Sequence, residues 1–142
     1  MSEPLVEFRI KENADSMYAA YKVISIVEKF GFNKKRSQEV GIIISELGTN
    51  IIKYGVEGTI EIHLLNEKKG VKIIARDKGK GILNVTYALK DNYTDEGPVF
   101  TETGERKSKS SGTGLAAIKR LSNNVNISTT PEGSVIECIV YP

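Results

Sequence analysis

The chain has 142 residues, of which 39% are hydrophobic and 27% charged, and this ordinary globular composition argues against a disordered chain. Lys and Arg (20) nearly balance Asp and Glu (18), so the net charge of +2 does not favour direct binding of nucleic acid. The single cysteine, Cys138, excludes a disulfide framework, and without a long apolar run or a secretory signal we expect a soluble cytoplasmic domain with no membrane contact.

The first half of the chain predicts one strand and two helices. Residues 5–10 alternate between apolar and polar side chains, as a half-buried strand does. Residues 13–16 are good N-caps, and a helix should run from there to Gly31, a residue type common just past a helix end. A second helix should begin near Asn33 or Ser37 and stop at Gly55. Helical spacing predicts the buried stripes, which are Met17, Ala20, Tyr21, Ile24 and Val27 in the first helix and Val40, Ile43, Ile44, Leu47 and Ile51 in the second.

The second half predicts two hairpins and a helix around a long loop. Strands over 59–66 and 71–76 form the first hairpin, followed by a turn over 77–81 and a short helix over 85–90. Polar and glycine residues over 91–112 indicate a loop long enough to be either functional or disordered. A helix over 115–121 precedes a last hairpin with strands over 125–129 and 135–141. This order predicts an α+β fold in one domain spanning 1–142, a two-layer sandwich with helices on one face of a mixed, mainly antiparallel sheet.

Glu46 and Asn50 form the first motif that can carry chemistry. They stand four residues apart on the second helix, so both side chains project from one face, offset from the apolar stripe. A carboxylate and a carboxamide one turn apart can activate a hydroxyl group and can ligate a hard cation through oxygen. An isolated pair of this kind is more often a solvated polar face, so further motifs must decide between the two interpretations.

Three further motifs combine glycine with a polar side chain. In Asp77-x-Gly79-x-Gly81 the carboxylate could accept a hydrogen bond from an amine of a flat ligand that the glycines allow to approach closely, or the segment could be a tight turn. Residues 110–115 run a glycine segment into a helix N-terminus, which either binds an anion or is an ordinary capped loop. Gly133-Ser134 in the last hairpin says nothing alone, since turns favour both residue types.

Taken together and in this order, the motifs resemble the Bergerat ATP-binding fold shared by DNA gyrase, sensor histidine kinases and MutL-type ATPases. Glu46-x-x-x-Asn50 resembles its N box, Asp77-x-Gly79-x-Gly81 its first glycine box and Gly112-x-Gly114 its second. The resemblance covers nearly the whole chain and is strongest to the bacterial partner-switching serine/threonine kinases and anti-sigma factors. Residues 44–51 and 114–121 are most similar to the switch kinases of the stressosome pathway.

The resemblance implies a role for each matching residue. Asp77 would accept from the adenine amino group, with Gly79 and Gly81 shaping the wall around the base and Ser134 supporting the contact through water. Asn50 would ligate Mg²⁺, and Glu46 would act as general base toward the attacking hydroxyl group. The phosphates of ATP or ADP would meet Gly112, Thr113, Gly114 and Leu115 at the helix start, and also Lys53 unless it is simply a solvated lysine. The segment 91–112, longer than in the switch kinases, would be a flexible lid over the nucleotide.

The resemblance implies three alternative functions. The first is an ATP-dependent protein serine/threonine kinase that phosphorylates a STAS-domain antagonist in stress or sigma-factor signalling, in contact with a stressosome-like complex or a phosphatase that it activates. The second is an anti-sigma factor that holds a sigma factor in a nucleotide-dependent way, and the third is a non-catalytic ATP-binding scaffold. A homodimer is compatible with each, since the outward side of the first helix, with Tyr18, Lys22, Ser25 and Lys29, could contact another subunit or a regulator, or could simply be solvated.

Overall fold

The computed structural model describes residues 3–79, 93–94, 97–98 and 114–142. In chain order the elements are β1 (Val6–Ile10), α1 (Asn13–Phe30), α2 (Lys34–Tyr54), β2 (Gly55–Leu64), a 3-10 turn (Glu67–Lys69), β3 (Val71–Gly79), β4 (Tyr93–Thr94), β5 (Gly97–Pro98), α4 (Gly114–Leu121), β6 (Asn124–Thr130) and β7 (Gly133–Val140). The predicted short helix over 85–90 lies outside the described residues. Within the segment predicted to be a loop, β4 and β5 pair with each other, which the sequence pattern did not indicate.

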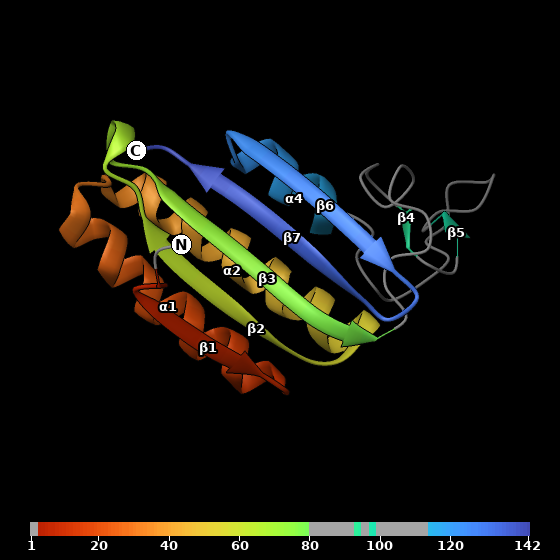
Figure 1. Cartoon of the computed structure of the whole chain (residues 1–142). Helices are drawn as coiled ribbons and strands as arrows, with labels where there is room; N and C mark the ends of the chain where they lie inside the picture. Colours follow the sequence, from red (N-terminus) through yellow and green to blue (C-terminus); the bar gives the residue numbers. More distant parts are fainter. Residues whose placement is uncertain (1–2, 80–92, 95–96, 99–113) are drawn as a thin grey trace.

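Five strands form one sheet in the order β1-β2-β3-β7-β6, and all three described long helices lie on one face of it (Figure 1). The predicted α+β sandwich is confirmed, and the sheet that we expected to be mixed has four pairings that are all antiparallel. Helix α2 lies centrally and contacts α1, α4 and strands β1, β2 and β3. No helix of the described residues covers the other face of the sheet, which is called the uncovered face below (Figure 1).

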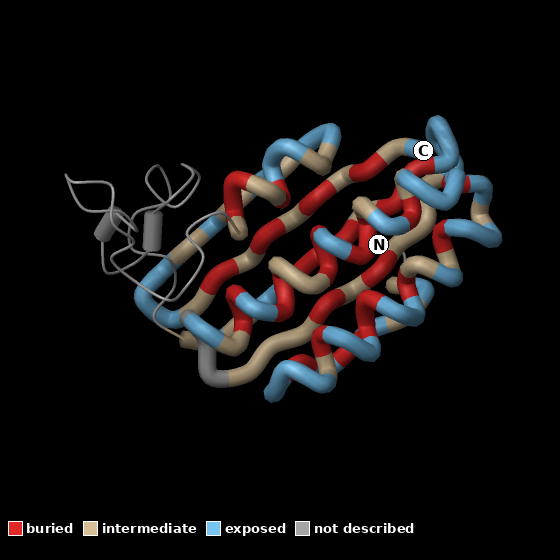
Figure 2. The backbone as a smooth tube through the Cα atoms, turned by 180° about the vertical axis from the view of Figure 1, so that it is seen from behind, coloured by how far each residue is buried: buried red, intermediate tan, exposed pale blue. Residues whose placement is uncertain are grey.

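The hydrophobic core fills the space between the sheet and the helices, where Figure 2 shows the buried backbone segments of both layers. The stripe predicted for α2 is confirmed, since all five of its residues are at most 1% exposed. On the sheet, alternate residues of β2, β3 and β7 face this core, which is why Ile60, Ile62, Ile73 and Ile136 are buried.

The stripe predicted for α1 is confirmed at Ala20 and Val27, Ile24 is partly buried, and the prediction is wrong at Met17 and Tyr21. Met17 and Tyr21 are 71% and 72% exposed, whereas the smaller Ser16, Ala19 and Ala20 are buried. The cause is a close helix crossing, because a Cβ added at Gly48 of α2 would overlap the Ser16 hydroxyl. Small residues on both helices permit this approach, and Met17 and Tyr21 are turned outward.

Helix α1 begins at the predicted place, but its N-cap residue is Glu12, just before the predicted residues 13–16. The carboxylate of Asp15 accepts hydrogen bonds from the backbone N–H groups of Lys11 (2.9 Å) and Glu12 (3.1 Å). These two bonds lower the pKa of Asp15 below its ordinary value. At the other end Gly31 adopts φ +122°, which explains why glycine ends this helix.

Arg36 ties the first turn of α2 to the end of the chain. Its guanidinium donates to the carbonyl oxygens of Tyr141 and Leu121 and to Asn123 Oδ1, each at 2.8 Å, and pairs with Glu39 at 3.1 Å. The side chain is 19% exposed. One planar group therefore fixes three separate segments at this end of the molecule.

Candidate functional site

Glu46 and Asn50 lie on the C-terminal half of α2, on the face that turns toward α4. Asn50 is 9% exposed, and Glu46 is partly exposed. Burial raises the pKa of the Glu46 carboxyl above its ordinary value of 4.5. A carboxylate that is more basic than usual is better suited to accept a proton.

The start of α4 brings the second glycine motif to this pair. A Cβ added at Gly114 would stand 2.7 Å from Glu46 Oε2 and 3.8 Å from Asn50 Oδ1, so the chain passes the two side chains with no room for a side chain of its own. The structure thereby joins two predicted motifs that are more than 60 residues apart in sequence. The first N–H groups of α4 have no intrahelical partner and favour an anion at this place.

Asp77 lies inside β3, not in the turn that the sequence predicted, because the strand continues to Gly79. Its register partners are Gly58 on β2 and Ser134 on β7. Burial raises the pKa of Asp77, and hydrogen bonds from the backbone N–H and the hydroxyl of Ser134 partly offset that rise. Ser134 is 2% exposed, so the predicted partnership with Asp77 is direct in this structure.

The hydroxyl of Thr129 extends this pair, and the sequence analysis missed it. Thr129 faces Ser134 across the β6–β7 ladder, with 3.4 Å between the two hydroxyl oxygens. The result is a row of three polar side chains on neighbouring strands, all on the helix-covered face. The only sequence signal was that Thr129 falls in phase with Val125 and Ile127, the inward residues of its strand.

Two glycines hold the neighbouring strands close to β3 at Asp77. A Cβ at Gly58 would overlap the carbonyl oxygen of Arg76 and stand 2.9 Å from Ile51 Cγ2, and one at Gly133 would overlap the carbonyl oxygen of Asp77. Gly58 thus also connects the Asp77 region to α2, one residue after Asn50. Gly58 was not among the predicted site residues, because the strand was predicted to begin only at residue 59, whereas β2 begins at Gly55 and contains this glycine. A glycine inside a strand is a signal of close approach.

Two buried polar atoms in this region have no hydrogen-bond partner: Asp77 Oδ1 and Asn50 Nδ2. Buried polar groups are nearly always satisfied, so orphaned ones indicate a missing ligand or water. An orphaned carboxylate oxygen fits an amine donor such as the exocyclic group of adenine. The residues present therefore fit a nucleotide that has its base near Asp77 and its phosphates near Asn50 and the start of α4.

The remaining predicted site residues divide into two groups. Lys53 is exposed on the last turn of α2, and the side chain of Leu115 is 4% exposed within the core, which leaves its backbone N–H as the group able to meet a phosphate. Gly79 ends β3, two residues after Asp77. Gly81, Gly112 and Thr113 lie outside the described residues, so their predicted roles stay predictions.

No cluster of three or more His, Cys, Asp or Glu side chains able to hold a metal occurs among the residues that the structure describes. That is compatible with Mg²⁺, which keeps several waters and is commonly bound by few protein oxygens together with substrate phosphates. In the same part of the chain, no helix combines the length and the apolar character needed to cross a membrane.

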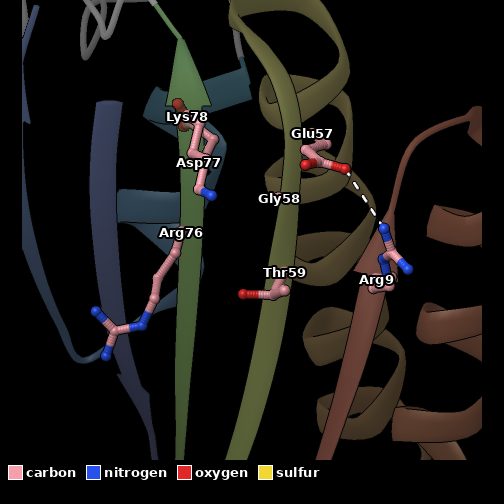
Figure 3. A pocket seen from close by; sticks show the side chains of 7 residues that line it. All are labelled: Arg9, Glu57, Gly58, Thr59, Arg76, Asp77 and Lys78. Atoms are coloured by element: carbon pink, nitrogen blue, oxygen red, sulfur yellow. Dashed lines mark ion pairs between the residues drawn. The ribbon is translucent and has the colours of Figure 1, made fainter. Parts of the chain in front are cut away.

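A pocket of about 370 Å³ lies on the uncovered face of the sheet (Figure 3). It is lined by Arg9 on β1, Glu57, Gly58 and Thr59 on β2, and Arg76, Asp77 and Lys78 on β3. Arg9 pairs with Glu57 at 3.5 Å, and Arg76 pairs with Glu61 at 3.2 Å. Of the polar residues discussed above it includes only Asp77, so it is distinct from the Glu46 and Asn50 region.

Comparisons with known proteins show what this chain is similar to. Residues 10–140 match the family model of the histidine kinase-like ATPase domain. The chain is 30% identical to the serine/threonine-protein kinase RsbT of Bacillus subtilis (strain 168), over 94% of this chain and 93% of that protein. It is 31% identical to the anti-sigma F factor of Anoxybacillus flavithermus, over 87% of this chain and 82% of that protein.

Two solved structures share the fold at low sequence identity. The histidine kinase domain of the blue-light activated histidine kinase EL346 from Erythrobacter litoralis matches with a TM-score of 0.53 and 12% identity, over 90% of this chain and 63% of that chain. A chain of the SiaB-SiaC complex from Pseudomonas aeruginosa matches with a TM-score of 0.60 and 14% identity, over 97% of this chain and 90% of that chain.

Proposed function

Since this chain belongs to the histidine kinase-like ATPase domain family, we propose that it is an ATP- and Mg²⁺-dependent protein serine/threonine kinase of the partner-switching class. Its substrate would be a serine or threonine of a STAS-type regulator, in the cytoplasm. The similarity to a serine/threonine-protein kinase over nearly the whole of both chains supports the reaction type.

One observation carries the proposal: the Glu46 carboxylate lies at the start of α4, beside Asn50. In the proposed reaction the hydroxyl oxygen of the substrate bonds to the γ-phosphorus of ATP, and the bond from that phosphorus to the β–γ bridging oxygen breaks. The hydroxyl proton goes to Glu46, and ADP leaves with the bridging oxygen. Phosphoryl transfer needs positioning and charge stabilisation more than covalent protein chemistry, and this site can provide both.

The other end of the site would hold the nucleotide base. Asp77 Oδ1 is buried and without a partner, and the hydrogen bonds from Ser134 fix the orientation of the carboxylate. An adenine amino group would satisfy this oxygen and so convert an unfavourable buried group into a specific contact.

Asn50 would be the protein ligand of Mg²⁺, whose charge would neutralise the phosphates during transfer. The backbone N–H groups at the start of α4 would face the same phosphates. Lys53, one turn further along α2 from Asn50, would add a positive charge at that end.

A second candidate is an anti-sigma factor whose hold on a sigma factor depends on nucleotide. The 31% identity to an anti-sigma F factor favours it specifically. Both candidates need Asp77 and Asn50, but only the kinase needs the general base.

The test uses purified protein, radiolabelled Mg-ATP and a lysate of the host, with the acid stability of any labelled band measured. Wild type should transfer label to a small protein in an acid-stable bond. Glu46→Ala should bind nucleotide but lose transfer by about 10³-fold, the effect typical of removing a general base, and Asp77→Asn should lose nucleotide binding. Glu39→Gln, on the same helix but paired with Arg36, is the matched control and should transfer normally.

Two outcomes would contradict the proposal. Unchanged transfer in Glu46→Ala would remove Glu46 from the base role. Nucleotide binding without any transfer, together with a sigma factor that co-purifies through gel filtration, would establish the anti-sigma alternative.

A further inference from the structure

The pocket on the uncovered face of the sheet has no part in the proposed phosphoryl transfer. It lies over strands β1, β2 and β3, near the end of β3, and has a volume of about 370 Å³ (Figure 3). Pockets of about 300–1,000 Å³ hold small molecules. Its size is therefore sufficient for a small organic ligand, and the chemistry of its lining decides which kind.

Three of the lining side chains stand in one row across the sheet. Arg9 on β1 is the register partner of Thr59 on β2, and Thr59 is the register partner of Arg76 on β3. Directly paired residues of a sheet point to the same face, so all three side chains lie on the uncovered face. In the next row Glu57 is the register partner of Lys78. Figure 3 shows the Thr59 hydroxyl directed toward β3, the strand that carries Arg76 and Lys78.

The lining carries an excess of positive charge. Arg9, Arg76 and Lys78 contribute three positive charges on this face and Glu57 contributes one negative charge, which leaves a net charge of +2. Asp77, the other acidic residue of the lining, belongs to the opposite phase of β3, whose side chains face the helices. A concave site with charges of mainly one sign attracts ligands of the other sign.

The two arginines keep hydrogen-bond donors for a ligand. Arg9 pairs with Glu57 at 3.5 Å, and Arg76 uses its Nε to pair with Glu61 at 3.2 Å. A guanidinium group has five N–H donors, so these ion pairs leave the N–H groups of both Nη atoms of Arg76 unused. The side chains of Arg9 and Arg76 are 71% and 51% exposed, and ion pairs this exposed are weak. Both arginines can therefore turn toward an anion at little cost.

We propose that this pocket binds the phosphate group of a small, soluble organic phosphate monoester. At neutral pH such a group carries a charge of about −1.5 to −2, which matches the positive excess of the lining. Its three terminal oxygens can accept from a guanidinium, an ammonium and a hydroxyl group together, whereas a carboxylate offers only two oxygens. The remaining volume of the pocket would hold the organic part of the ligand.

The new site and the proposed nucleotide site lie on opposite faces of the same sheet. Asp77 would hold the nucleotide base on the helix-covered face, while Arg76 and Lys78, its neighbours on β3, point to the uncovered face. Both ligands can therefore be bound at once. The new site goes beyond the proposed kinase activity and does not depend on it.

The first test titrates glycerol 3-phosphate into the purified chain and follows the backbone amides by NMR. The titration is run with and without Mg-ADP, and both runs should give the same saturable binding, with a dissociation constant of about 1 mM or below. The largest shifts should fall on Thr59 and its neighbours on β2 and β3. Glycerol, which lacks the phosphate, should not bind.

Substitutions in the lining should change this affinity in opposite directions. Lys78→Ala should raise the dissociation constant about tenfold and Thr59→Val about fivefold, because each removes a hydrogen bond to a charged group. Glu57→Gln should lower it about threefold, because it removes the negative charge from this face of the lining. Lys72→Ala, on the same face of β3 but outside the pocket, is the matched control and should bind as wild type does. All four side chains are at least partly exposed, so the variants should fold normally, which circular dichroism will verify.

Three results would overturn the proposal. The first is an absence of saturable binding, and the second is binding that Lys78→Ala and Thr59→Val leave unchanged. The third is an affinity that Lys53→Ala reduces and Lys78→Ala does not, which would place the phosphate at the nucleotide site. Weaker binding by Glu57→Gln would show that this carboxylate contacts the ligand and would reject an anion as the occupant.

The same phosphate chemistry occurs in the headgroup of phosphatidic acid. The charged side chains around the pocket favour a soluble ligand, because they do not enter a bilayer. Sedimentation with phosphatidylcholine vesicles that contain phosphatidic acid distinguishes the two sources, and we expect the protein to stay in solution. Retention on these vesicles that is lost in Lys78→Ala would overturn the soluble source and assign the lipid headgroup to the pocket.

Discussion

The two ends of helix α2 differ in how well the polar groups around them are hydrogen-bonded. At the N-terminal end Arg36 has a partner for each part of its guanidinium, in three separate segments. At the C-terminal end Asn50 Nδ2, and beyond it Asp77 Oδ1 on β3, are buried without partners, and burial raises the pKa of both Glu46 and Asp77. The two regions lie at opposite ends of the long strands, with the C-terminus at the Arg36 end (Figure 1).

The difference separates a polar cluster that holds the fold together from one that is prepared for a ligand. Satisfied buried hydrogen bonds stabilise the folded chain, whereas orphaned and desolvated groups destabilise it until something binds. Substitutions at the first end should therefore reduce stability, and those at the second should chiefly change binding or transfer.

Arg36→Ala should give the largest loss of stability. It removes the donor from two partly buried carbonyl oxygens and from Asn123, so the free energy of unfolding should fall by about 3 kcal/mol, measured by urea denaturation. Nucleotide affinity, measured by titration on the folded variant, should stay unchanged. Arg76→Ala is the control, because its ion pair is half exposed and should cost less than about 0.5 kcal/mol. A large change in affinity for Arg36→Ala would abolish the contrast between the two ends.

Gly58→Ala should reduce both the stability of the fold and the affinity for nucleotide. The added Cβ would overlap the carbonyl oxygen of Arg76, and that backbone can move only by shifting Asp77, so we expect a loss of about 2 kcal/mol in stability and weaker nucleotide binding. Gly41→Ala is the matched control, since its Cβ would meet only side-chain atoms of Ile24 on α1 and no backbone. If Gly58→Ala binds nucleotide as well as Gly41→Ala does, the close strand approach does not position Asp77.

Ser134→Ala should weaken nucleotide binding by about fivefold, which corresponds to about 1 kcal/mol for one buried hydrogen bond. The loss of the hydroxyl should also raise the pKa of Asp77 further, because that hydrogen bond opposes the effect of burial. Isothermal titration calorimetry at several pH values measures both effects. Ser128 is an exposed serine on β6, so Ser128→Ala should change neither the nucleotide affinity nor the pKa of Asp77. Equal behaviour of the two variants would show that Ser134 does not act on Asp77.

Glu46→Gln should give the smallest change in the free energy of unfolding. It should raise that free energy at neutral pH, whereas most substitutions lower it. Because the folded state raises the pKa of Glu46 above 4.5, the folded protein holds this proton more tightly than the unfolded chain does. The stability contribution of the protonated form is therefore lost as the pH rises through the raised pKa. Glu46→Gln should be more stable than wild type at neutral pH, by less than about 1 kcal/mol, and equally stable below pH 4.5. Thermal unfolding at both pH values measures this, and a destabilised variant at neutral pH would contradict it.

The elements that the sequence predicted well are those whose pattern depends on one local rule. The α2 stripe, the two hairpins and the ends of α1 follow from spacing, turn glycines and caps. The α1 stripe failed at Met17 and Tyr21 because Ser16 and Gly48 meet in a crossing that only the three-dimensional structure contains. Asp77 was expected in a turn because glycines follow it, and its pairing with Ser134 keeps it in the strand instead.

The same distinction holds for the site. The motifs predicted Glu46, Asn50 and Asp77, and the family resemblance added Ser134. The structure brings Glu46 and Asn50 together at α4 and pairs Asp77 with Ser134. Thr129 and Gly58 were missed because they matter only through their register partners on other strands. Nothing in a strand's own sequence states which residue of another strand will lie opposite it.

The alternation of β3 has a consequence for how such a protein can diverge. Asp77 points to the helices, while its neighbours Arg76 and Lys78 are exposed on the uncovered face. Natural selection on surface recognition can therefore replace Arg76 and Lys78 freely, because neither side chain reaches the layer that holds Asp77. A lineage could acquire new binding partners through this outer face while Asp77, on the inner face of the same strand, stays unchanged.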